Sequence, residues 1–455
     1  MKIIHVASEF NPIAKVGGLG DVVHGLSKEL VQQGHEVEVI LPKYDILNLQ
    51  PLRTLAKKSF LGFYTVWQAV FDHVPLTLLS LEDEAQSLKR GRIYGEADDA
   101  ARFLLFCKAA SDYVSKIKTS ILHLHDWHTS ALVLKNPGVK KVLTIHNANY
   151  RGCTSPQLLQ DFATFNREKW SDPLLKDSVS LLRGGIECAD SVTTVSPTYA
   201  NEICEPKGSC LYPYLKKAKL KGILNGLDID YWNPYSDPHL GQTFSSDLGE
   251  SKKANRLILQ KMYHMGSSKG PLVGVISRLV PQKGLHLIKE ALFETIRLGG
   301  QAILLGSSPD PSIQEAFLSL ARTYKKEPNL HFEFEFNESL AHKIYAASDL
   351  ILVPSLFEPC GLTQMIAMRY GALPLVRETG GLKDTVFNGS NGFTFKEAEK
   401  QEIQKTLQHA FKIYHEESEQ WALMRAKAHK FKRSWNQAAK EYLKIYSEVL
   451  TPTPS

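Results

Sequence analysis

The chain has 455 residues, of which 43% are hydrophobic and 22% are charged, values close to those of ordinary globular proteins. Because typical domains hold ~100 to 200 residues, this length predicts two large domains, or three small ones, each with a full hydrophobic core. The formal net charge of +6 is small for this size, and the Lys and Arg residues are scattered along the chain, which argues against nucleic-acid binding.

The sequence also gives expectations about location. The start of the chain lacks the longer apolar region and small-residue cleavage site of a signal peptide, so we expect no export signal. No apolar run approaches the ~20 residues needed to span a bilayer. The six cysteines form no Cys-x-x-Cys pair, which is typical of reduced thiols in a cytosol. We therefore expect a soluble cytoplasmic protein that binds no membrane.

The first half of the chain alternates short apolar runs with an amphipathic segment. Residues 3–7 predict a buried strand, residues 21–33 a helix that Gly34 ends, and residues 37–41 the next strand. Such a βαβ unit predicts a parallel sheet. Later strands are expected at residues 121–124, 141–145 and 191–195. Functional side chains are expected where these strands end.

A turn-rich stretch without periodicity, residues 228–253, predicts the interdomain linker. Strands are then expected at residues 272–276, 302–305, 350–353 and 373–376, the last one short because it contains Pro374. We assign residues 1–240 to an N-terminal Rossmann-like domain and residues 250–434 to a C-terminal one. A closing helix within residues 435–455 is long enough to pack against either domain, and we list it with the N-terminal one.

The turn between the first strand and first helix contains Lys15, Gly17, Gly18 and Asp21. Glycines there let backbone N–H groups approach an anion near a helix N-terminus, as in a phosphate cradle. The spacing matches neither the dinucleotide fingerprint nor the Walker motif. An ordinary tight turn with a solvated lysine fits the spacing equally well.

Two further clusters lie in the second half. Arg278 and Lys283 follow its first strand, and a buried cation pair could neutralise a leaving diphosphate, although two surface cations are the alternative. Residues 357–364 join a strand to an amphipathic segment, which is again an anion site. Glu358 cannot hold phosphate, so it would contact a sugar hydroxyl or stabilise positive charge on the sugar ring. A carboxylate that only satisfies the helix dipole is the alternative.

Polar residues also end two neighbouring strands of the first half: His123, His125, Asp126, His128, His146 and Asn147. Strand alternation places His123 and His125 on one face of the sheet. Tetrahedral ligand spacing is absent, so recognition of sugar hydroxyls is favoured over a metal site.

Taken together, eight motifs in chain order resemble the bacterial glycogen (starch) synthase family. They are residues 15–21, 125–128, 144–147, 189–203, 222–228, 277–284, 354–364 and 377–385. The resemblance implies an α/β protein of the GT-B fold, in which two Rossmann-like doubly wound domains face each other across a deep cleft.

The resemblance also implies an activity. Glucose would pass from ADP-glucose to the non-reducing end of an α-1,4-glucan such as glycogen, with retention of configuration; UDP-glucose is the alternative donor. No metal or cofactor is implied, because cationic side chains would stabilise the leaving group. Two rivals are a nucleotide-sugar epimerase and a non-catalytic sugar-nucleotide sensor. The histidine cluster at residues 125–128 argues against the first rival, and the charges retained at Lys15, Arg278, Lys283 and Glu358 argue against the second.

Site residues are carried over from the same resemblance. The expected catalytic residues are Glu358, Asp126, His146, Arg278 and Lys283. The expected donor contacts are Lys15, Gly17, Gly18, Asn225, Arg278, Lys283, Phe336, Cys360, Gly361, Leu362 and Thr363, with Phe336 stacked on adenine. The expected acceptor side comprises Glu9, Asp21, His125 and Asn147.

Overall fold

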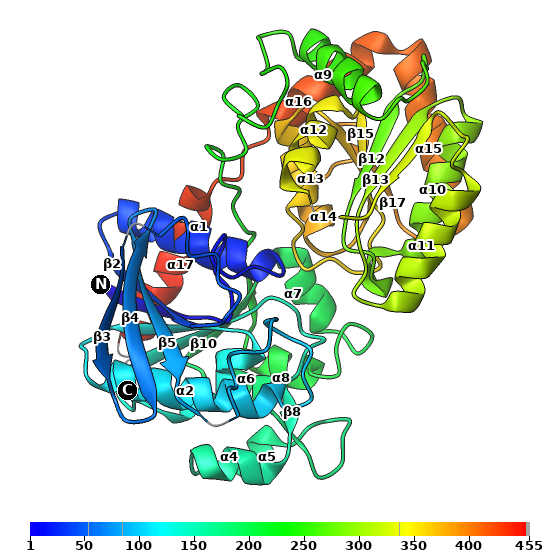
Figure 1. Cartoon of the computed structure of the whole chain (residues 1–455). Coiled ribbons are helices and arrows are strands. Elements are labelled where there is room, and N and C mark those ends of the chain that lie inside the picture. Colours follow the sequence, from blue (N-terminus) through cyan, green and yellow to red (C-terminus); the bar gives the residue numbers. More distant parts are fainter. Residues whose placement is uncertain (53, 84, 336, 452–455) are drawn as a thin grey trace. The chain divides into compact units, whose positions relative to one another are not determined.

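The computed structural model describes residues 1–52, 54–83, 85–335 and 337–451 (Figure 1). The chain folds into two compact units: Met1–Gly226 with Ser434–Ser455, and Leu227–Arg433. The first unit thus ends at Gly226, before the expected boundary at residue 240. The reason is packing, because the buried carboxylate of Asp237 accepts hydrogen bonds from His342 and Tyr370 of the second unit.

In the described part of the chain, the first unit contains a nine-stranded sheet in the order β11-β10-β7-β6-β1-β2-β5-β4-β3. Its strands are β1 (Lys2–Val6), β2 (Glu36–Pro42), β3 (Thr54–Phe60), β4 (Tyr64–Phe71), β5 (Val74–Leu81), β6 (Ile121–His125), β7 (Lys140–Ile145), β10 (Ser191–Thr194) and β11 (Lys221–Gly222). All neighbours are parallel except β3 with β4 and β4 with β5. The parallel strands at the predicted positions are confirmed, whereas β3 to β5 were not predicted. A small ribbon of β8 (Cys153–Thr154) and β9 (Val179–Ser180) lies apart.

Strand β1 pairs with β2 on one side and with β6 on the other, so the sheet reverses its winding direction here. Helix α1 (Gly18–Gln32) follows β1 and buries Val22, Val23, Leu26 and Leu30, as its apolar spacing predicts. The other helices of this unit are α2 (Asp99–Ser115), α3 (Trp127–Ser130), η1 (Ala131–Leu134), α4 (Pro156–Phe162), α5 (Arg167–Trp170), α6 (Leu181–Cys188), α7 (Pro197–Ile203), α8 (Tyr212–Lys217) and α17 (Trp435–Leu450).

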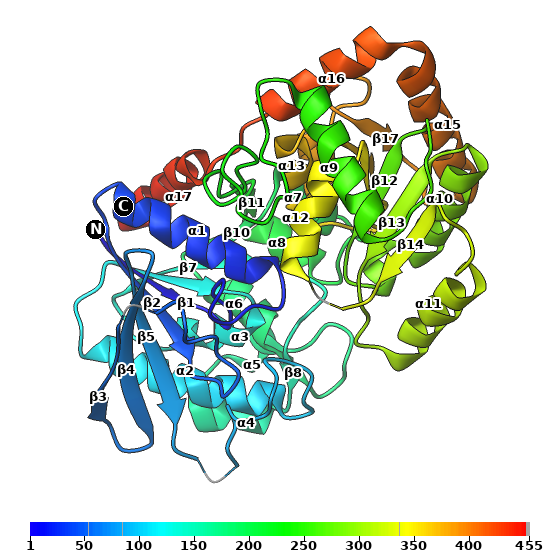
Figure 2. The same cartoon turned by 45° about the horizontal axis from the view of Figure 1, so that its top comes forward.

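Helix α17, which comes from the far end of the chain, packs beside α1 in the first unit (Figures 1 and 2). Its buried residues Trp435, Tyr442 and Tyr446 share one core with Ile3 and Leu26, among others. Gly25 of α1 makes this possible, because any side chain there would overlap the Trp435 indole.

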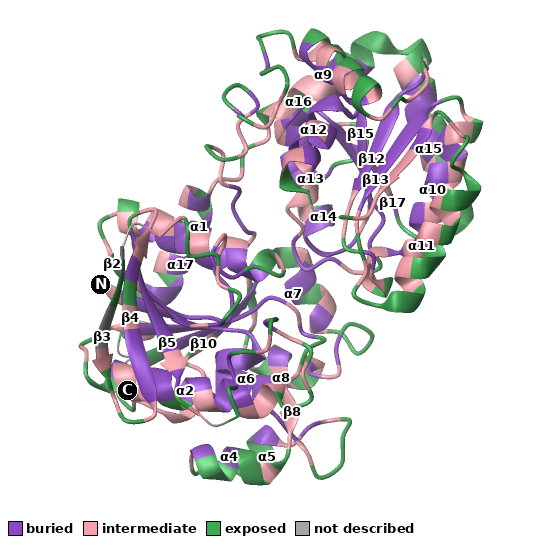
Figure 3. Ribbon diagram, viewed as in Figure 1, coloured by how far each residue is buried: buried purple, intermediate pink, exposed green. Residues whose placement is uncertain are grey.

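Within its described residues, the second unit contains a six-stranded parallel sheet in the order β14-β13-β12-β15-β16-β17. Its strands are β12 (Leu272–Ile276), β13 (Gln301–Leu305), β14 (Leu330–Glu333), β15 (Leu350–Val353), β16 (Leu373–Arg377) and β17 (Phe393–Phe395). The four predicted strands are confirmed, and β14 and β17 are additional. The winding direction reverses between β12 and β15. Figure 3 shows the central strands buried and the outer faces of the flanking helices exposed.

The helices of the second unit are α9 (Leu248–Met262), η2 (Pro281–Lys283), α10 (Leu285–Arg297), α11 (Pro311–Thr323), α12 (Glu338–Ala347), α13 (Thr363–Arg369), α14 (Gly380–Thr385), α15 (Lys400–Glu416) and α16 (Ser418–Lys430). Helix α9 begins inside the predicted linker because the Asp247 side chain caps it by accepting from the N–H of Glu250. None of the helices in the described residues combines the length and hydropathy that crossing a bilayer requires. None of the six cysteines, all of which lie in the described ranges, forms a disulfide bond.

Candidate active site

A buried carboxylate organises the turn between β1 and α1. Glu9 Oε2 accepts the N–H groups of Val16 at 2.7 Å and Gly17 at 2.8 Å, and Glu9 Oε1 accepts the Tyr94 hydroxyl at 2.8 Å. Both oxygens are therefore used inside the protein, and the Gly17 N–H is already occupied. Tyr94, which also bonds Ser8 at 2.7 Å, is a site residue that no sequence motif indicated.

The cation of this turn lies at the surface. Lys15 Nζ is 2.8 Å from Asp21 Oδ1, and the two side chains are 39% and 20% exposed. Such an exposed pair contributes at most ~1 kcal/mol and is easily exchanged for another anion. Gly17 and Gly18 have open space where a side chain would be, so a ligand can approach the backbone there.

Asp126 joins the ends of β6 and β7. Its carboxylate oxygen Oδ1 accepts the backbone N–H of His146 at 2.7 Å and that of Asn147 at 3.4 Å. The Asp126 backbone has a φ of 57°, a conformation that costs a non-glycine residue ~1 to 3 kcal/mol. Burial raises the pKa of the Asp126 carboxyl to about 7, although the two backbone N–H groups oppose the shift. Strain and a displaced pKa in one residue are typical of functional sites.

Buried histidines continue from Asp126 into the sheet. His125 Nδ1 lies 3.0 Å from His146 Nε2, and His125 Nε2 lies 3.0 Å from Nδ1 of His5, a residue that the sequence motifs did not indicate. His123 is buried on the same face, as predicted, and its ring stacks 4.4 Å from that of His125. Burial lowers the pKa of His5 and of His146 to about 3, so these rings are neutral.

Contact of Glu9 and His125 with an acceptor stays a prediction, and their side chains are engaged inside the first unit. His125 is fully buried with both ring nitrogens engaged, and Glu9 is only 4% exposed with both oxygens engaged. Both residues hold other site residues in place. Asn147 and Asp21 are only partly buried and stay candidates for the acceptor side.

Three of these histidines lie close enough to be considered as metal ligands, since one nitrogen each from His5, His123 and His125 lies within 4.8 Å of the others. His123, however, uses both nitrogens on hydroxyl groups, those of Thr144 and Tyr446, each at 2.7 Å. The separation of 3.0 Å between His5 and His125 is that of a hydrogen bond, whereas tetrahedral zinc ligands at ~2.0 to 2.1 Å from the metal would be ~3.3 to 3.4 Å apart. The arrangement favours a hydrogen-bonded row over a metal centre.

Asn225 follows β11 at the other side of the first sheet. The residue is 5% exposed, and its side-chain oxygen is buried without a hydrogen-bond partner among the described residues. An unpaired buried acceptor costs ~1 to 3 kcal/mol, so a role beyond packing is indicated.

In the second unit, the turn after β12 meets the turn after β15. Lys283 Nζ lies 2.6 Å from Glu358 Oε2, which also accepts the Ser355 hydroxyl at 2.8 Å. The Lys283 and Glu358 side chains are 19% and 9% exposed, so this is a mostly buried ion pair. Gly284 has a φ of 69° and faces the Pro354 carbonyl, where a side chain would overlap. The glycine therefore allows the two turns to approach each other.

The buried Gln364 and the partly buried Arg377 shape the turn that carries Glu358. The Gln364 amide donates to the carbonyls of Cys360 at 3.2 Å and Gly361 at 2.8 Å, and Arg377 Nε donates to the Ser355 carbonyl at 2.9 Å. Leu362 and Thr363 lie at the start of α13, where helix N–H groups can donate to an anion, and their contact with the donor stays a prediction.

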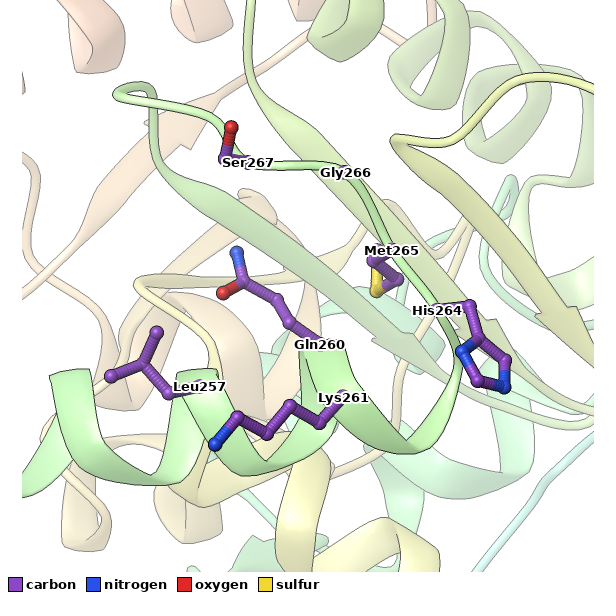
Figure 4. Close-up of a pocket in the computed structure, with 7 residues that line it drawn as sticks. All are labelled: Leu257, Gln260, Lys261, His264, Met265, Gly266 and Ser267. Carbon is purple, nitrogen blue, oxygen red and sulfur yellow. The ribbon is translucent and has the colours of Figure 1, made fainter.

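Two expected donor contacts have different outcomes. Arg278 is exposed, and its guanidinium has no ion-pair or hydrogen-bond partner among residues that the structure describes. Phe336 lies outside the described residues. A pocket of about 370 Å³ in the second unit, lined by Leu257, Gln260, Lys261, His264, Met265, Gly266 and Ser267, contains none of the expected site residues (Figure 4).

Apart from Asn225, which follows the edge strand β11, these site residues lie at the carboxyl ends of strands at or next to the point where each sheet reverses direction, which is the binding position in open α/β sheets. Comparison with known proteins agrees. Residues 2–224 match the family model of the starch synthase catalytic domain, and residues 265–427 match that of glycosyl transferases group 1. Two Rossmann-like units with these matches define a glycosyltransferase of the GT-B class.

Relatives identify the family within this class. The chain is 39% identical to the glycogen synthase of Protochlamydia amoebophila (strain UWE25) over 99% of both chains. It is 40% identical to probable starch synthase 4 of Arabidopsis thaliana over 99% of this chain, which spans only 47% of that protein. The catalytic domain of starch synthase IV from Arabidopsis thaliana, solved with ADP and acarbose, matches with a TM-score of 0.93, 38% identity and 99% coverage of both chains. The chain therefore belongs to the glycogen and starch synthase family and is a glucosyltransferase.

Proposed function

We propose that this protein transfers glucose from ADP-glucose to the non-reducing end of an α-1,4-glucan, with retention of the anomeric configuration. The proposal is supported by the starch synthase relative that binds ADP and acarbose. The observation that carries it is the Lys283–Glu358 pair beside the start of α13, since it brings a cation, a carboxylate and helix N–H groups together where two turns meet.

In this proposal, Lys283 stabilises the departing diphosphate. A bound diphosphate replaces Glu358 as the main partner of the Lys283 ammonium, and the exposed Arg278 supplies a second cation. The N–H groups of Leu362 and Thr363 donate to the same phosphates. Donors that are already in place where negative charge develops are the largest single source of rate enhancement in many enzymes. Glu358 then lies beside the transferred glucose.

Residues of the first unit have complementary roles in the proposal. Lys15 and Gly18 contact the distal phosphate and the sugar, and Asn225 offers its unpaired oxygen to a sugar hydroxyl. Asp126 fixes the backbone of His146, whose carbonyl is a candidate partner for the reacting anomeric carbon. Asn147 and Asp21 are left to the acceptor side.

We also propose that transfer needs no metal, because Lys283, Arg278 and the start of α13 supply the positive charge that a divalent cation would supply. Activity should therefore persist in excess EDTA. A cytoplasmic location is proposed because none of the six cysteines forms a disulfide bond.

The test is incubation of the purified protein with labelled ADP-glucose or UDP-glucose and glycogen. We expect incorporation from ADP-glucose, with label released by an enzyme that cleaves α-1,4 linkages from non-reducing ends. Conversion of the sugar without incorporation would indicate the epimerase rival, and tight binding without any conversion would indicate the sensor. Incorporation from UDP-glucose only would overturn the assigned donor but keep the reaction class.

A further inference from the structure

Three histidines of the first unit are joined end to end by hydrogen bonds. His5 comes from β1 and His125 from β6, and His146 follows β7, so neighbouring parallel strands supply the row. Nδ1 of His5 bonds Nε2 of His125, and Nδ1 of His125 bonds Nε2 of His146, both at 3.0 Å. Burial lowers the pKa of all three rings, so each ring is neutral near pH 7.

Neutral rings permit only two proton orders along this row. Each ring carries one N–H, and each of the two bonds needs one donor and one acceptor. Either all three protons lie on Nδ1 and the donors point from His5 toward His146, or all three lie on Nε2 and the donors point the other way. Any mixed order leaves two lone pairs or two N–H groups facing each other. The tautomer of His146 is therefore coupled to that of His5.

The two ends of the row differ. His5 Nε2 is buried and has no hydrogen-bond partner within the described ranges. A proton on this nitrogen would be a buried N–H without an acceptor, which is rarer in proteins than an unpaired acceptor. At the other end, the Asp126 carboxylate accepts the His146 backbone N–H at 2.7 Å, and Glu9 lies close enough to Asp126 to help raise the pKa of its carboxyl. When the donors point from His5 toward His146, the positive end of the dipole of the histidine row lies at His146. A negative carboxylate at this end favours that proton order.

We propose that His5 and His125 are positioning residues that hold His146 in the Nδ1–H tautomer, so that its ring offers an N–H donor to an oxygen of the bound sugar nucleotide. Neither His5 nor His125 touches the ligand, because both are fully buried. The ligand named here rests on the proposed function, whereas the proton order of the free protein does not.

The direct test is nuclear magnetic resonance of the full chain labelled with ¹⁵N-histidine, without ligand, at pH 7.5. Long-range proton–nitrogen correlations report which ring nitrogen carries the proton, and the His146 signals are identified by their absence in His146→Gln. We expect a protonated Nδ1 and a bare Nε2 for His146. A proton on Nε2 of His146 would overturn the proposal, whether or not the protein transfers glucose.

Two substitutions of His5 separate proton order from packing. The amide N–H of His5→Asn can replace the Nδ1–H, whereas His5→Phe fills the volume without a donor. We expect His5→Asn to keep the His146 tautomer and most of kcat, and His5→Phe to give mixed tautomers and a kcat lowered by about 10-fold with ADP-glucose saturating. A role in packing predicts the reverse ranking, because phenylalanine suits a buried strand better than an amide does.

Tyr446→Phe is the matched control. It removes the hydroxyl that bonds His123 Nδ1 at 2.7 Å, beside the row but outside it. We expect the His146 tautomer to be unchanged in this variant. A mixture of His146 tautomers in Tyr446→Phe would show that any repacking of the histidines disturbs the proton order. That result would contradict a specific role for His5.

Discussion

At the scale of single residues, the two units contain different kinds of charged group. Lys283 and Glu358 form a mostly buried pair, in which each charge depends on the other. Among the described residues, Asp126 is a buried carboxyl held by backbone N–H groups alone, without a cationic side chain to balance its charge. In the proposed function, the first arrangement supplies a cation to the bound diphosphate. The second makes the protonation of one residue sensitive to pH.

Lys283→Ala should lower kcat by ~10²-fold or more, because it removes stabilisation from the developing diphosphate. Initial rates with ADP-glucose saturating check this. Lys325→Ala, at an exposed lysine of the same unit, should leave kcat unchanged. A loss below about threefold for Lys283→Ala would refute its role at the leaving group.

The raised pKa of Asp126 predicts how stability changes with pH. Between its usual value of 3.8 and about 7, the native carboxyl binds a proton that the unfolded chain does not bind. The free energy of unfolding therefore falls as pH rises through this window, by roughly 4 kcal/mol for this group at most. Asp126→Asn keeps the carbonyl oxygen for the His146 N–H and removes the titration.

Urea unfolding of Asp126→Asn and of the unchanged protein at pH 5 and pH 8 measures this effect. We expect the variant to gain stability relative to the unchanged protein at the higher pH. Comparing the two proteins at each pH cancels the opposite contribution of the buried histidines, whose lowered pKa values reduce stability as pH falls. A difference independent of pH would mean that Asp126 titrates normally.

At the scale of elements, glycines on α14 shape the turn that carries Glu358. Side chains at Gly380 and Gly381 would overlap the backbone of Glu358 and Cys360, respectively. Gly380 also has a φ of 46°, which favours glycine. These glycines therefore serve packing, whereas Gly17 and Gly18 leave space open on the other unit.

The two kinds of glycine should respond oppositely to alanine. Gly381→Ala should destabilise the second unit by ~1 to 3 kcal/mol, because the overlap forces the Cys360 backbone to move. Gly18→Ala should leave the melting temperature unchanged or slightly raised, since alanine favours the start of α1, but should lower kcat/KM for ADP-glucose. Calorimetry and initial rates on both variants test this. Full kcat/KM in Gly18→Ala would exclude Gly18 from the donor contacts.

At the scale of the whole molecule, the chain crosses between its units twice. Residues 227 and 433 are joined by a backbone hydrogen bond of 2.8 Å, so the two crossings lie side by side. The first unit depends on both ends of the chain, because Trp435 packs in a core with residues of β1 and α1. The second unit is continuous in sequence.

Two tryptophans, one in each unit, test whether the units are stabilised separately. Trp435 is 6% exposed and Trp421 is 5% exposed, so Trp435→Ala and Trp421→Ala each remove a buried side chain. Each substitution should lower the free energy of unfolding by ~3 to 5 kcal/mol. The loss should fall in the unit of Met1–Gly226 for the first variant and in Leu227–Arg433 for the second. Hydrogen exchange resolved by peptide measures both. Equal loss of protection throughout the chain for either variant would show one cooperative unit instead.

The sequence by itself determined the positions of the parallel strands around β1, β6, β12 and β15 and of the glycine turns after them. Its motifs also indicated Lys283, Glu358 and Asp126 as candidate site residues. These features are local, because apolar periodicity and turn residues act over a few positions. The family could be recognised for the same reason, since each motif is a short segment at a strand end.

Only the tertiary structure decided what these residues contact. Lys283 and Glu358 are 75 positions apart, and His123 and Tyr446 are 323 apart. The burial of His125, the internal role of Glu9, the addition of His5 and Tyr94, and the assignment of Asp237 and α17 to their units all follow from strand order and register. Those depend on which distant segments pair, and the local pattern of side chains does not encode that choice.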